Sequence, residues 1–193
     1  MLLDHLRGYI SQRPRTSALS LFPGDAWGIA VTQWNADTPP PELQRNVSAL
    51  LGLGHGLTPD GDDYLLGYLA ALHHCHRLVA HFRVMANAVS IGLARTTGIS
   101  QHYLQLASQG HFSQSILILI NSIATNPQAD VLINAADRVM QYGASSGIDT
   151  LAGFLHGLRT VVEAVEQWDS ARLDRNTQLH DSAVGGGMRS NIY

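Results

Sequence analysis

The sequence predicts a mainly α-helical domain with a short β-hairpin near its N-terminus. Three observations lead to this fold class. Apolar residues recur at helical spacing along most of the chain. Two similar glycine-rich loops, one ending at Gly61 and one at Gly147, each open an apolar helix, so we expect two pseudo-repeated loop–helix units. One pair of apolar runs, separated by Pro23-Gly24-Asp25, has the pattern of a hairpin.

Composition limits the classes of function. The chain has 193 residues, enough for one well-buried domain, with 45% hydrophobic and 14% charged residues. A net charge of −3 and the absence of any basic run argue against binding to nucleic acid or to a membrane surface. The single cysteine suits a reducing compartment, and Asp4 interrupts any N-terminal apolar segment. We therefore expect a cytoplasmic protein.

The N-terminal third combines several kinds of structure. Residues 2–12 have the spacing of a short amphipathic helix. The hairpin is predicted over residues 18–31, and a proline-rich linker follows it. A helix then starts near Pro41 and reaches Leu51. The chain is thus divided into residues 1–40 (helix, hairpin and linker), 41–168 (helical domain) and 169–193 (a polar, flexible tail).

Six further helices are predicted within the helical domain. The apolar run Ile116–Ile120 fits either a helix or a strand, and we predict a helix because Ser122 and Ile123 extend it beyond usual strand length. The expected helices run from Asp62 to about His81, over residues 83–95, from Ser100 to Gly110, from Ser113 to Ala124, over residues 128–141, and from the second glycine-rich loop to about Trp168.

The two glycine-rich loops belong to a repeat. Asp63 and Asp149 lie 86 residues apart (149 − 63), and the same offset relates Gly61 to Gly147 and Gly67 to Gly153. Small residues at Gly67/Ala71 and Gly153/Gly157 share one helical face in each copy, so we infer that the two helices cross closely about a pseudo-two-fold axis. Asp60-x-x-Asp63 and Ser146-x-x-Asp149 both have the pattern of a capping box.

Paired helix N-termini predict a binding site for an anionic group. Unpaired N–H groups and the positive end of the helix dipole favour phosphate, carboxylate or carbamoyl groups. Thr58, Ser145 and Ser146 would add hydroxyl donors, and His55 a group that titrates near neutral pH. The alternative is that both loops merely cap their helices.

Asp62 is the sharpest candidate for a catalytic residue. Capping explains Asp60 and Asp63, but the counterpart of Asp62 in the repeat is the apolar Ile148. The alternative is a solvated acid in the first helical turn. Mg²⁺ ligation by the three aspartates is a further alternative, although their spacing is not that of an EF-hand. Four histidines, His73, His74, His76 and His81, lack zinc-site spacing and are predicted to lie on a polar outer face. No metal or other cofactor is expected.

Three sequence blocks resemble one known family. They are Gly54-x-Gly56-Leu57-Thr58-Pro59-x-Gly61-Asp62-Asp63, then Thr96-Thr97-x-Ile99-Ser100, and Ser145-Ser146-Gly147-x-Asp149. In order and spacing they are similar to the AllH-like family, over roughly residues 45–160. Asp60 departs from the pattern, in which a small residue such as serine is expected.

The resemblance implies a subunit of an oxamate carbamoyltransferase-like enzyme in purine-derived nitrogen catabolism. Its expected partners are a small anionic metabolite and either further subunits or copies of itself. Two alternatives remain: a non-catalytic helical module for ligand binding or assembly, and a metal-dependent hydrolase that uses the aspartates. The residues expected around the ligand, besides a catalytic Asp62, are His55, Gly56, Thr58, Gly61, Asp63, Thr97, Ser100, Ser145, Ser146 and Asp149.

Overall fold

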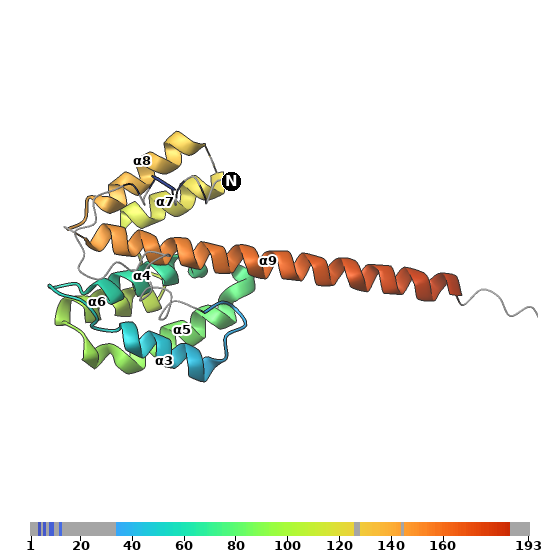
Figure 1. The fold of residues 1–193 in the computed structure, drawn as a ribbon, viewed down its shortest axis with the longest axis horizontal. Helices are drawn as coiled ribbons and strands as arrows, with labels where there is room; N and C mark the ends of the chain where they lie inside the picture. The colour runs from blue at the N-terminus through green and yellow to red at the C-terminus, as the bar shows by residue number, and fades with distance from the viewer. Residues whose placement is uncertain are drawn as a thin grey trace, which may run out of the picture.

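The fold is mainly α-helical, as predicted (Figure 1). The computed structural model describes residues 4, 6, 8, 9, 12, 34–125, 128–143 and 145–185, and none of these residues lies in a strand. The hairpin predicted over residues 18–31 lies outside the described residues. The α-helices are α3 (Pro40–Leu50), α4 (Asp60–His73), α5 (Val79–Gly92), α6 (Gly98–Ser108), α7 (Gln114–Thr125), α8 (Ala129–Met140) and α9 (Ser146–Gly185), and two short 3₁₀ helices, η1 (His76–Leu78) and η2 (Leu93–Arg95), flank α5.

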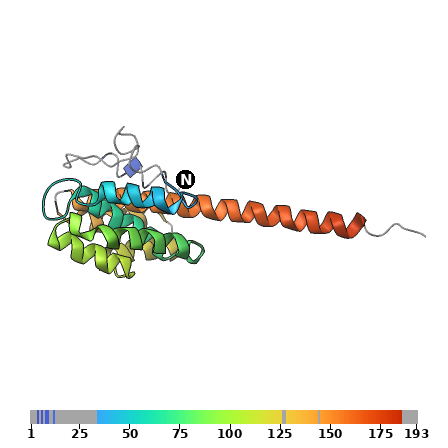
Figure 2. The ribbon, with the colours of Figure 1, turned by 90° about the horizontal axis from the view of Figure 1, so that it is seen from below.

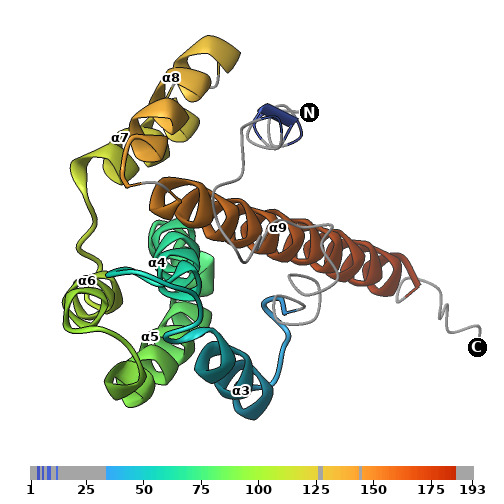
Figure 3. The same cartoon turned by 60° about the vertical axis from the view of Figure 1, so that its left-hand side comes forward.

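The helices pack around the α4–α9 pair. α4 lies along the N-terminal part of α9, and this is the most extensive contact between two elements. α7 and α8 lie on one side of α9, whereas α3, α5 and α6 lie on the other (Figures 1 and 3). None of the described helices is both long and apolar enough to cross a membrane.

The N-terminal helix contributes to the core. Asp4, Leu6, Gly8 and Tyr9, which are among the few described residues there, are helical, in agreement with the prediction for residues 2–12. Leu6 is fully buried. The Tyr9 hydroxyl donates to the carboxylate of Asp137, at 2.9 and 3.0 Å from its two oxygens, and so ties this helix to α8.

The predicted close crossing of α4 and α9 is confirmed. A Cβ added to Gly67 would overlap the carbonyl oxygen of Thr150, and one added to Gly153 would overlap that of Tyr64. Tyr64 and Thr150 occupy equivalent positions in the repeat, so the two contacts are reciprocal, as a pseudo-two-fold axis requires. Only glycine allows the two backbones to approach this closely.

The repeat is larger than the sequence indicated. Gly61 packs against the carbonyl of Leu50 at the end of α3, and Gly147 packs in the same way against that of Val139 near the end of α8. The repeated unit is therefore a helix–loop–helix, made of α3–α4 and of α8–α9. The path from Leu50 to Gly61 is three residues longer than that from Val139 to Gly147, and this difference hides the first helix from a gap-free alignment.

Two predicted helix ends are wrong. α4 ends at His73 instead of near His81, and α5 begins at Val79. The stretch His73–Leu78 contains neither glycine nor proline, the usual stop signals, so periodicity alone did not reveal the break. α9 continues to Gly185, so residues 169–185 are helical where a flexible tail was predicted. Its C-terminal part projects away from the other helices (Figure 2).

The glycine contact makes a sharp prediction about stability. Gly153→Ala should lower the free energy of unfolding by about 2 kcal/mol or more, because the new methyl group overlaps the Tyr64 carbonyl. The control is Gly98→Ala in α6, where an added Cβ meets no atom within 4 Å. That substitution should be neutral or mildly stabilising. Urea unfolding of both variants measures the difference, and equal stabilities would contradict the close crossing.

Candidate functional site

Three segments that are distant in the sequence meet at the N-terminal ends of α4, α6 and α9. The hydroxyl oxygens of Thr58, before α4, and Ser146, at the start of α9, are 2.8 Å apart and share a hydrogen bond. The Thr97 hydroxyl, before α6, donates to the carbonyl of Leu57. We call these four residues the loop junction. It joins residues from all three sequence blocks.

Asp62 joins two of these segments to α4. It is only 2% exposed, so the alternative of a solvated first-turn acid is wrong. One carboxylate oxygen accepts the Gly52 N–H at 2.9 Å, and the other accepts the Thr96 hydroxyl. Burial raises the pKa of Asp62, and the hydrogen bonds from Thr96 and Gly52 partly offset that rise. Both oxygens are thus engaged within the chain.

Asp63 and Asp149, which are equivalent in the repeat, each keep one carboxylate oxygen without a hydrogen bond. They are 8% and 2% exposed, and the Oδ2 atom of each has no partner among the described residues. Burial raises the pKa of Asp63 to about 7 and that of Asp149 to about 8. A buried acceptor without a partner is uncommon in native proteins and calls for an explanation.

The two aspartates differ in the group that faces them. Hydrogen bonding by the Ser146 and Thr58 hydroxyls lowers the pKa of Asp63 and opposes the effect of burial. Asp60 takes the place of Ser146 in the first copy of the repeat, and its negative charge raises the pKa of Asp149 further. Asp149 is therefore the harder of the two to ionise.

Backbone N–H groups at the two helix starts are largely occupied. The Gly61 N–H donates to the Leu53 carbonyl at 2.9 Å, and the Gly147 N–H donates to the Tyr142 carbonyl at 3.1 Å. The N–H groups of Asp63 and Asp149 bond to the carbonyls that precede their helices. The donors on which the predicted anion site depends are therefore used by the chain itself.

The predicted caps are displaced by one or more residues. Asp60 is the first residue of α4 and Pro59 precedes it without a side-chain cap, so the capping box predicted for Asp60 is wrong. Thr97 caps α6 by accepting the Ser100 N–H at 3.2 Å. Ser100, where the sequence predicted this helix to start, lies inside α6 and is buried, and its hydroxyl has no partner among the described residues.

The remaining predicted site residues lie around the loop junction. His55 and Gly56 are exposed in the α3–α4 loop. The Ser145 carbonyl accepts from the first turn of α9. Across the described part of the chain, no three histidine, cysteine, aspartate or glutamate side chains are arranged to hold a metal ion.

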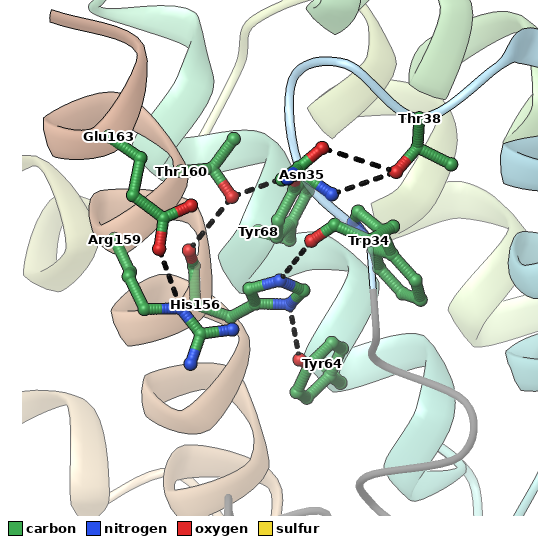
Figure 4. Close-up of polar contacts among 9 residues, drawn as sticks. All are labelled: Trp34, Asn35, Thr38, Tyr64, Tyr68, His156, Arg159, Thr160 and Glu163. Atoms are coloured by element: carbon green, nitrogen blue, oxygen red, sulfur yellow. Dashed lines mark hydrogen bonds and ion pairs between the residues drawn. The ribbon is translucent and has the colours of Figure 1, made fainter. Parts of the chain in front are cut away.

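A buried network behind the junction was missed by the sequence analysis (Figure 4). The ring of His156 in α9 bonds through Nε2 to the Trp34 carbonyl at 2.8 Å and through Nδ1 to the Tyr64 hydroxyl at 2.6 Å. Because a carbonyl can only accept, Nε2 carries the proton and Nδ1 accepts from the tyrosine. Burial lowers the pKa of His156 to about 4, so the ring is neutral.

A second chain of hydrogen bonds lies beside the first. His81 Nε2 and the Tyr68 hydroxyl are 2.9 Å apart, and the Tyr68 hydroxyl donates to Thr160 at 3.2 Å. His81 is buried, so its predicted place on the outer face is wrong, whereas His73, His74 and His76 are exposed as predicted. Pairs spaced by four residues, Tyr64/Tyr68 in α4 and His156/Thr160 in α9, are the one sequence signal for this network.

The raised pKa of Asp149 predicts a dependence of stability on pH. Unfolded Asp149 ionises near pH 3.8, whereas folded Asp149 keeps its proton to about pH 8, so stability falls as pH rises through that interval. Above pH 6.5 the two buried histidines stay neutral in the folded state and lose their remaining charge in the unfolded state, which offsets this fall by less than about 1 kcal/mol. Between pH 6.5 and 8 the free energy of unfolding should therefore fall by about 1–2 kcal/mol.

Asp149→Asn should reduce this slope, because asparagine does not ionise. The matched control is Asp130→Asn, which changes an exposed acid in the first turn of α8 and should keep the wild-type slope. Urea unfolding at three values of pH measures it. A wild-type stability that rises over the same interval would contradict a buried, protonated Asp149.

Comparison with known proteins identifies the family of this chain. Residues 50–158 match the family described as "Oxamate carbamoyltransferase subunit AllH", a stretch that contains all three loops of the junction. No solved structure matches the chain. The family match covers more than half of the sequence, and the chain therefore belongs to the AllH family.

Proposed function

We propose that this chain is a subunit of a carbamoyltransferase and that its carbamoyl-bearing metabolite binds at the loop junction. The observation that carries the proposal is the meeting of three separate loops through the Thr58–Ser146 and Thr97–Leu57 hydrogen bonds. All of these residues lie within the family match. Loops that are held together on rigid helices are where binding sites are commonly found.

Each group at the junction has a role in this proposal. The hydroxyls of Thr58, Thr97 and Ser146 hold the three loops at fixed positions relative to one another. Asp62, predicted as the catalytic residue, acts as a positioning residue, because both of its oxygens bind other parts of the chain. Asp63 and Asp149 are the groups left to contact the metabolite, since each has an unused buried oxygen.

Exposed apolar side chains beside the junction support the subunit assignment. Leu57, Ile99 and Tyr103 are 70%, 43% and 49% exposed. The Thr97–Leu57 bond joins the loop that carries Leu57 to the start of α6, where Ile99 lies, and Tyr103 lies one turn further along α6. A partner subunit that covers these residues would also close the junction from solvent and supply cationic groups for the anionic end of the metabolite.

The proposal is tested by Thr58→Val in the enzyme assembled with its partner subunits. Loss of the Thr58–Ser146 bond should lower kcat/KM for carbamoyl transfer by about three- to tenfold, as expected for one hydrogen bond. Thr125→Val, at the exposed end of α7, is the control and should have no effect. Equal activities of the two variants would show that the loop junction is not part of the active site.

A further inference from the structure

The unpartnered oxygens of Asp63 and Asp149 point to the chemistry of the ligand. Leaving a buried acceptor without a hydrogen bond costs about 1–3 kcal/mol. The two aspartates are equivalent in the repeat, and both show the same vacancy at Oδ2. A ligand that donates a hydrogen bond to each of these two oxygens would remove both of these costs.

An anionic group suits this place poorly. Asp60, Asp63 and Asp149 are all buried here and would repel a carboxylate or phosphate. The first-turn N–H groups of Gly61 and Gly147, which could have offset the repulsion, bond to carbonyls of their own loops. The vacancies are therefore acceptors, and the nearby backbone N–H donors are already in use.

A neutral donor suits it better than a metal ion. Burial keeps the pKa of Asp63 near 7 and that of Asp149 near 8, so both groups are partly protonated at neutral pH. A protonated carboxyl group both donates and accepts, which matches the N–H and C=O of a primary amide. The terminal –NH₂ of an amide also carries two hydrogens that point in different directions.

We propose that Asp63 and Asp149 together bind the –CONH₂ end of the substrate, each accepting one amide hydrogen, and that they select this end against a carboxylate. The inference rests on the proposed function, since it concerns the same site. It adds the orientation of the substrate: the amide end faces the α4–α9 helix pair, and the anionic end faces outward, toward the apolar rim of Leu57 and Ile99.

Oxamate and oxalate are matched probes for this selection, because they differ only in an amide in place of a carboxylate. Calorimetry on the assembled enzyme should show oxamate binding at least about tenfold more tightly, since a site built to accept N–H groups rejects an analogue that lacks them. Asp63→Asn and Asp149→Asn should each reduce this preference severalfold, because asparagine presents an N–H of its own. Asp130→Asn should retain it.

Three outcomes separate the inference from the proposed function. Equal binding of the two probes by the wild-type enzyme, or a preference unchanged in both aspartate variants, overturns the inference alone. If Thr58→Val also leaves carbamoyl transfer unchanged, the proposed function fails with it. The wild-type comparison needs no variant, so it decides the question even if an asparagine variant does not fold.

Discussion

The contact between α4 and α9 is the constraint on which the rest of the structure depends. Gly67 meets the backbone of Thr150 and Phe154, and Gly157 meets the backbone of Tyr68 and the side chain of Ala71, so the two helices run in the same direction. Parallel helices that touch place their N-termini at the same end. The loops that precede the two helices therefore meet as well, and the hydroxyls of Thr58 and Ser146 come within hydrogen-bonding distance.

The same contact also explains why carboxylates are buried. The first turns of both helices lie in the interface, so Asp63 and Asp149 are removed from water together. Burial without ion pairing is unfavourable for stability, yet it produces carboxyl groups that titrate near neutral pH. The neutral ring of His156 is hydrogen-bonded at both nitrogens, and it anchors α4, α9 and Trp34 to one another. The hydrogen-bonded network thus helps to hold α4 and α9 together despite the unfavourable burial of the two carboxyl groups.

The sequence predicted the features that depend on local pattern. Gly67 and Gly153, at equal places in two similar segments, were sufficient to predict a close crossing, which brings the N-termini of the two helices together. Asp62 was singled out because its counterpart in the repeat is apolar, but its partners Gly52 and Thr96 are set by tertiary structure. Tyr64 and His156 are 92 residues apart, and no periodicity connects them.

The orientation of the substrate is the central claim, and a crystal structure of the assembled enzyme with bound oxamate tests it most directly. We expect the amide nitrogen to lie about 2.7–3.2 Å from carboxylate oxygens of both Asp63 and Asp149. The carboxylate of oxamate should point away from the α4–α9 pair. Oxamate bound with its carboxylate toward these aspartates, or bound away from the loop junction, would contradict the account.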